Sequence, residues 1–256
     1  MNAHSLVGSH LGKRGCAAND AHPGRGTELV AGLVKALTPN RVDEERHSMT
    51  KVDLRKDLKH LYNPSAKAVA LVDVPPMNFL MLDGSGDPNT SPAYVAAIEA
   101  LFALSYALKF RVKTSQAGVD YAVMPLEGLW WVDDPRQFSM QDKGNFQWTA
   151  MIMQPPYVTA ALVAEMLAET QKRKGLAALE KIRFTSYAEG LSVQIMHIGP
   201  YAAEEPTIAR LHRFIAESGY TLRGKHHEIY LNDVHKTAPE KLQTVVRQPV
   251  EKAGAA

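Results

Sequence analysis

The stretch MNFLMLDG at residues 77–84 recurs in altered form as LSVQIMHIG at residues 191–199, and this repeat decides the fold. Each copy is a short, mainly apolar run that ends in glycine, which is typical of a buried strand. After each copy the sequence predicts a helix and then a strand pair, at 119–131 in the first copy and between His226 and Arg247 in the second. We therefore predict an α+β fold with two βαββ modules, about 77–132 and 191–250. A pseudo-twofold axis should relate the modules around a central ligand cleft.

The helix of the first copy has a clear beginning. Ser91 is a residue type that caps helix N-termini through its hydroxyl, and Pro92 is favoured at the first helical position. Tyr94, Ile98 and Leu108 recur at helical spacing, so we expect this stripe of the helix to cover the sheet.

Composition excludes several classes of protein. The 256 residues are 45% hydrophobic, which is normal for a globular protein, and no apolar run reaches the ~18 residues of a membrane span. A net charge of +2 is too small to indicate nucleic-acid binding. The single cysteine, Cys16, cannot form an internal disulfide, which suits the cytoplasm.

The ends of the chain differ from its centre. Residues 1–48 are rich in Gly, His, Asn, Arg and Ala and lack strand periodicity, so we expect a disordered N-terminal tail. The alternative is an organelle transit peptide, because basic residues precede most of the acidic ones. We expect one folded domain over 49–250 and a C-terminal tail over 251–256.

One strand combines acidic and aromatic residues. The period of two places His226, Glu228 and Tyr230 on one face of the segment 226–231, and the opposite face then reads as the core or the helix-covered side. A carboxylate beside a phenol in a groove would have a raised pKa and could bind a cation or move a proton near neutral pH. The alternative is an ordinary exposed strand face, with Glu228 in water.

Aromatic side chains are the second candidate feature. Because Trp130 and Trp131 are adjacent, one should enter the core and the other should line the groove. The remaining candidates lie at or near strands, and they are Trp148, Tyr121, Tyr157 and Tyr187. As a set they favour an aromatic cage for a flat hydrophobic ligand, although each ring taken singly could be plain packing.

The sequence carries no metal signature and no nucleophile motif. The rings of the adjacent His226 and His227 point to opposite faces of a strand, so they are poorly placed to share an ion. A GxSxG motif and a cysteine are both missing from residues 49–250. We expect neither a metal nor a cofactor.

Several motifs resemble one known family. They are LKHLY at 58–62, MPLEGLWW at 124–131, HIGPY at 197–201 and GKHHEIYL at 224–231. Together with residues 77–89 they make the chain similar to the GyrI-like small-molecule-binding family, and in particular to its free-standing branch.

The resemblance implies a function. Family members bind bulky hydrophobic, often cationic compounds in an aromatic pocket with a buried carboxylate. Some free-standing members resemble cyclopropanoid cyclopropyl hydrolases, which open the cyclopropane ring of DNA-alkylating natural products. By position, Glu228 is then the carboxylate and Tyr230 its phenol neighbour. Trp131, Trp148 and Tyr121 are the cage walls carried over by position, and we add Tyr157, Tyr187 and His226 as candidate ligand-binding residues. Because the last strand, 244–250, lacks the acid of regulator members, Glu228 would be the sole central carboxylate.

Two functions follow from this interpretation. In the first, the cage holds a hydrophobic aromatic xenobiotic, and Glu228 activates a water that hydrolyses a cyclopropane-bearing alkylator. In the second, the protein sequesters or senses a drug without chemistry. A transcription regulator would need a DNA-binding domain, and residues 1–48 show no helix-turn-helix pattern. The family resemblance also implies DNA gyrase as a protein partner, which nothing in the sequence supports.

Overall fold

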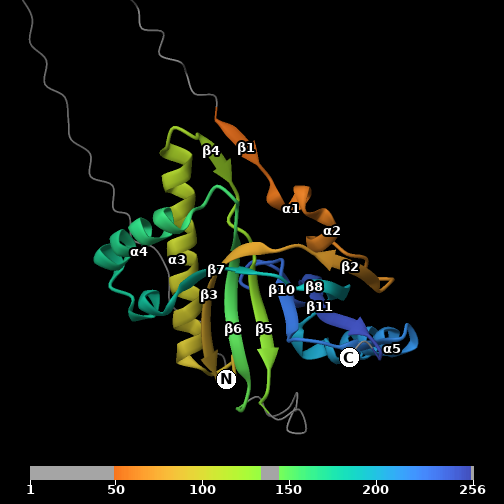
Figure 1. The fold of residues 1–256 in the computed structure, drawn as a ribbon. Helices are drawn as coiled ribbons and strands as arrows, with labels where there is room; N and C mark the ends of the chain where they lie inside the picture. The colour runs from red at the N-terminus through yellow and green to blue at the C-terminus, as the bar shows by residue number, and fades with distance from the viewer. Residues whose placement is uncertain (1–48, 134–143, 255–256) are drawn as a thin grey trace, which may run out of the picture. The chain divides into compact units, whose positions relative to one another are not determined.

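A computed structural model describes residues 49–133 and 144–254, and Figure 1 shows their arrangement. Within them nine strands form one antiparallel sheet with the order β2-β8-β11-β10-β5-β6-β3-β7, and β9 pairs with β11. The strands are β2 (Ala70–Val74), β3 (Met77–Ser85), β5 (Leu126–Trp131), β6 (Gln147–Gln154), β7 (Arg183–Tyr187), β8 (Gly190–Ile198), β9 (Tyr220–Leu222), β10 (His226–Tyr230) and β11 (Gln243–Lys252). The α+β prediction is confirmed. The predicted tail at 1–48 lies outside the described residues.

The two modules exchange their edge strands. The first module is β3, α3 (Pro92–Thr114), β5 and β6, and the second is β8, α5 (Glu205–Glu217), β10 and β11. The strand that precedes each module pairs with the other module, because β2 pairs with β8 and β7 pairs with β3. Neither module therefore has a complete sheet of its own.

The strand pair of the first module differs from the predicted one. We expected both strands within 119–131, but β4 (Val119–Tyr121) pairs in parallel with β1 (Thr50–Val52) in a separate two-stranded sheet. The partner of β5 is instead β6, from Leu126 opposite Ile152 to Trp131 opposite Gln147. β4 is only three residues long, and Pro125, which has no N–H to donate, separates it from β5. At the other end of the chain, β11 continues to Lys252, so the predicted tail at 251–256 begins as strand.

Helices cover one face of the sheet, which we call the helix face. α3 begins at Pro92, and the hydroxyl of Ser91 accepts a hydrogen bond from the N–H of Tyr94, as its sequence indicates. α3 packs over β3 and β6, while α5 packs over β8 and β11. α4 (Ala160–Lys174) lies against α3 (Figure 1).

α3 is long and apolar enough to meet the composition criterion for a membrane span. Nine of its residues are buried, however, including Leu101, Leu104 and Leu108, which are fully covered by the rest of the protein. Packing against the sheet and α4 therefore accounts for the buried apolar residues of this helix, while Val95, Tyr106 and Phe110 are exposed.

The opposite face of the sheet, which we call the cleft face, is contacted by α2 (Lys59–Tyr62), which follows the short helix α1 (Leu54–Asp57) and lies next to β2. Backbone carbonyls of α2 accept hydrogen bonds from buried side chains of this face: His60 from Gln194 at 2.6 Å and Leu61 from Arg247 at 2.6 Å. The described residues also include the short 3-10 helices η2 (Ala177–Lys181), η3 (Tyr201–Ala203) and η4 (Pro239–Lys241).

A buried ionic network joins the modules on the cleft face. His227 on β10 contacts Glu127 on β5 at 3.0 Å through Nε2, and Glu189, just before β8, at 3.0 Å through Nδ1. Arg247 on β11 donates to the other oxygen of Glu189 at 3.0 Å. The hydroxyl of Tyr62 donates to Glu127 at 2.8 Å. All five side chains are at most 2% exposed, so the network links both modules and α2 inside the protein.

The network fixes the charge of its members. Burial alone would lower the pKa of His227, but Glu189 and Glu127 raise it to about 9. Burial alone would raise the pKa of Glu189, but His227 and Arg247 lower it to about 2. Near neutral pH the imidazolium of His227 and the guanidinium of Arg247 therefore both face the carboxylate of Glu189. Removing one partner of a buried ion pair lowers the free energy of unfolding by about 3–5 kcal/mol, because it leaves an uncompensated buried charge.

Raising the pH from 6.5 to 9 should lower the free energy of unfolding by about 3 kcal/mol through His227. The pKa of His227 is higher in the folded than in the unfolded chain. Its contribution is therefore complete below pH 6.5 and is lost as the pH rises through about 9. Urea unfolding across this range measures the loss, and NMR of the histidine rings assigns it to His227.

His227→Gln is the test variant, and His235→Gln is its control because His235 is exposed. The decrease in the free energy of unfolding with rising pH should persist in His235→Gln and become smaller in His227→Gln. A wild-type stability that stays constant over this range, with no histidine ring titrating near its upper end, would contradict the network.

Candidate ligand cleft

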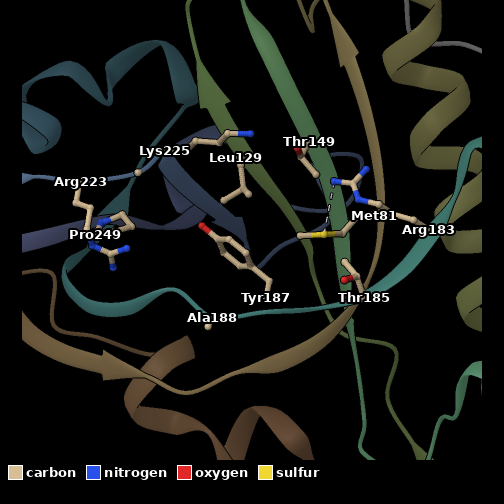
Figure 2. Close-up of a pocket in the computed structure, with 11 residues that line it drawn as sticks. Met81, Leu129, Thr149, Arg183, Thr185, Tyr187, Ala188, Arg223, Lys225 and Pro249 are labelled. Atoms are coloured by element: carbon tan, nitrogen blue, oxygen red, sulfur yellow. Dashed lines mark hydrogen bonds between the residues drawn. The ribbon is translucent and has the colours of Figure 1, made fainter.

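A cavity of about 390 Å³ opens on the cleft face between the two modules (Figure 2). Strands β3, β5, β6 and β7 supply Met81, Leu129, Thr149, Arg183, Thr185 and Tyr187. The second module and its connections supply Ala188, Arg223, Gly224, Lys225 and Pro249. Side chains of both halves therefore line one hollow, in the position that the duplicated sequence predicts. Its volume lies in the range of ordinary small-molecule sites.

Met81, Leu129 and Tyr187 give the cavity an apolar and aromatic part. The ring of Tyr187 lies edge-on to Phe79, with 6.3 Å between centroids, and its hydroxyl end points into the cavity beside Leu129 (Figure 2). Burial and the nearby charge of Glu189 raise the pKa of Tyr187 to about 12, so the phenol stays neutral and can donate a hydrogen bond.

Three cations surround the cavity in different ways. Arg183 forms a two-pronged ion pair with Asp83, at 2.6 and 2.9 Å, so its charge is balanced. Arg223 donates to the main-chain oxygen of Glu189, which carries no charge. The ammonium of Lys225 lies over the ring of Trp131, 3.1 Å from the centroid. Within 49–133 and 144–254, neither Arg223 nor Lys225 forms an ion pair with a carboxylate.

Glu228 lies on the helix face, opposite the cavity. Its carboxylate accepts a hydrogen bond from the hydroxyl of Tyr230 at 2.7 Å and lies 3.3 Å from Nε2 of His226. Its side chain is 15% exposed, so it is neither in bulk water nor sealed in the core. The strand pattern correctly places these three residues on one face. That face is the helix-covered one, whereas the sequence favoured the opposite side for the helices.

Aromatic rings surround Glu228. Tyr94 of α3 packs at 4.9 Å from Trp148 and at 5.6 Å from Trp130, and Tyr201 packs edge-on to Tyr230 at 5.3 Å, all between ring centroids. Burial and the charge of Glu228 raise the pKa of Tyr94 well above its usual range. We call these five rings together with Glu228 and His226 the Glu228 cluster.

Two glycines make room for its indoles. A Cβ on Gly84 would lie 2.2 Å from the ring of Trp148, and one on Gly128 would lie 2.7 Å from Nε1 of Trp130. Gly128 is also directly opposite Glu228 in the β5–β10 pair. The indole of Trp130 therefore lies next to the carboxylate.

The other sequence candidates are dispersed. Trp131 and Tyr187 lie on the cleft face, away from Glu228. Tyr121 and Tyr157 pack against each other, with 5.5 Å between ring centroids. Tyr157 follows the C-terminal end of β6, whereas Trp148 lies at the N-terminal end of that strand. The structure thus brings His226 and Tyr230 into contact with Glu228 and places Trp148 against Tyr94 of the same cluster, but the remaining four aromatic residues lie elsewhere.

Sequence reasoning missed several residues of both faces. Glu228 is not the sole central carboxylate, because Glu127 and Glu189 are buried at the same level of the sheet. Tyr94 belongs to the apolar stripe of its helix, and Tyr201 belongs to the HIGPY motif, so both carried a signal. The only sequence signal for Lys225 was its position directly before His226.

Comparison with known proteins places the chain among small-molecule-binding domains. The model of the GyrI-like small molecule binding domain matches residues 67–251. An uncharacterized conserved protein from Listeria innocua shares 34% identity and a TM-score of 0.73, over 78% of this chain and 100% of that one. A hydrolase from Listeria innocua shares 34% identity and a TM-score of 0.71, over 79% and 100%. A search of curated protein sequences gives no match.

Proposed function

This chain belongs to the GyrI-like small-molecule-binding family, and we propose that its cleft binds a flat, hydrophobic aromatic xenobiotic. The observation that carries the proposal is the cavity of about 390 Å³ between the modules. Leu129 and Met81 offer apolar contacts, and Tyr187 offers both a ring edge and a hydroxyl donor. These features match a ligand with one planar apolar body and one hydrogen-bond acceptor.

The ionic network supports this proposal because it keeps the cleft preformed. Glu189 is joined to Arg247 and His227 inside the protein and lies two residues after Tyr187. The backbone at one side of the cleft is therefore held before any ligand arrives. A preformed site avoids part of the entropic cost of ordering on binding.

Tyr187→Ala should weaken binding of the neutral probe 2-naphthamide by about tenfold or more, because it removes an aromatic wall worth about 1.5–3 kcal/mol when buried. Isothermal titration calorimetry measures the affinity. The control is Tyr106→Ala, which removes a tyrosine of α3 that is 48% exposed and distant from the cleft. Equal affinities in the wild type and both variants, or no binding by the wild type, would refute the proposal.

The Glu228 cluster favours a second candidate function, hydrolysis of a cyclopropane-bearing electrophile. Water would attack a ring carbon and give its proton to Glu228. The breaking C–C bond would pass its electron pair to the ligand carbonyl, whose oxygen a tyrosine hydroxyl would stabilise. The supporting observations are the partly exposed carboxylate, its phenol partner Tyr230, and Nε1 of Trp130, which has no acceptor among the described residues. Two structural relatives from Listeria innocua are named hydrolases, at 33% and 34% identity.

Glu228→Gln should reduce hydrolysis of a cyclopropane-bearing alkylator by about 100-fold or more, because the amide cannot accept the proton of water. Mass spectrometry follows the gain of one water by the ligand. Glu240→Gln removes an exposed carboxylate and should keep wild-type turnover. Equal turnover in both variants would exclude Glu228 from the reaction. A wild-type protein that binds the alkylator and leaves its mass unchanged would favour sequestration instead.

A further inference from the structure

The cleft carries positive charge that the protein does not balance. The bidentate contact with Asp83 neutralises Arg183. Within the described residues, Arg223 donates to a carbonyl oxygen and Lys225 lies over an aromatic ring, and neither forms an ion pair of its own. Both lie on the segment that leads into β10, on the same side of the cavity. A ligand in the cleft is therefore exposed to an excess of cationic groups.

The carboxylates behind the cleft do not offset this excess. Glu127 and Glu189 already face His227 and Arg247 at hydrogen-bond distance, so the network is close to neutral as a whole. A cation that entered the cavity would find no uncommitted carboxylate among the described lining residues.

Lys225 is well placed to contact a ligand. It is half-buried, and its ammonium end points over the cavity between Leu129 and Thr149 (Figure 2). The ring of Trp131 occupies one side of the ammonium, and an ammonium has three N–H donors. At least one donor is therefore available to an acceptor inside the cleft. Burial lowers the pKa of Lys225, the charge of Asp83 partly offsets this effect, and the charge of Arg183 adds to it.

We propose that the cleft selects flat aromatic ligands that carry an anionic or carbonyl acceptor, and that Lys225 is the residue that recognises this group. The inference rests on the proposed binding function and specifies its ligand class. The aromatic body lies against Tyr187 and Leu129, while the acceptor takes a hydrogen bond from the Lys225 ammonium. A cationic ligand of the same shape is repelled by Lys225 and Arg223.

Three probes of one shape test the inference: 2-naphthoate, 2-naphthamide and 2-naphthylmethylammonium. Calorimetry on the full chain should give the tightest binding for the anion and the weakest for the cation, with at least about a tenfold difference between them. Lys225→Met keeps the aliphatic stem and removes the charge. It should weaken naphthoate binding by about tenfold, weaken naphthamide binding less, and leave the cation no weaker than before.

Lys174→Met is the matched control, because it removes the same charge from an exposed position at the end of α4. It should leave all three affinities unchanged. Equal binding of the anion and the cation, or equal effects of Lys225→Met and Lys174→Met on naphthoate, would overturn the inference and leave the binding site intact. Failure of all three probes to bind the wild type would instead overturn the proposed function itself.

Discussion

The buried contacts of His227 with Glu127 and Glu189 are the constraint on which the rest of this structure depends. They lie where β5 of the first module meets β10 of the second, and Arg247 and α2 complete them. Removing two carboxylates and two cations from water is costly, and the cost is recovered only if every partner is in place. We propose that the network thereby specifies one relative position of the modules. An apolar contact of the same size would be far less selective for register and orientation.

The same strand pair gives the two faces different chemistry. On β5 and β10, alternate residues point to opposite sides, so Glu228 and Glu127 are close in the sheet but belong to separate environments. On the helix face the carboxylate of Glu228 accepts a hydrogen bond from Tyr230, lies beside the indole of Trp130 and remains partly exposed. On the cleft face Glu127 is committed to an ion pair and contributes rigidity. We propose that the cleft binds the ligand and that Glu228 marks the second candidate site.

The fold could be predicted further from the sequence than the site could. The duplicated stretch, the Ser91 cap and the shared face of His226, Glu228 and Tyr230 depend on local periodicity, and the structure has all of them. The network depends on partners 38–186 residues apart, and no local pattern indicates such pairs. The side covered by helices was equally hard to assign, because both faces of β10 combine polar and apolar residues. The pairing of β4 with β1 was missed for a related reason, since a three-residue strand carries almost no periodic signal.

A crystal structure of the protein with 2-naphthoate at saturating concentration tests the central claim most directly. The account predicts that the naphthyl ring occupies the cleft against Tyr187 and Leu129, with its carboxylate at hydrogen-bond distance from the ammonium of Lys225. It also predicts that the contacts of His227 with Glu127 and Glu189 are the same with and without the ligand. A ligand bound beside Glu228 on the helix face, or a cleft that opens only when the network breaks, would contradict the account.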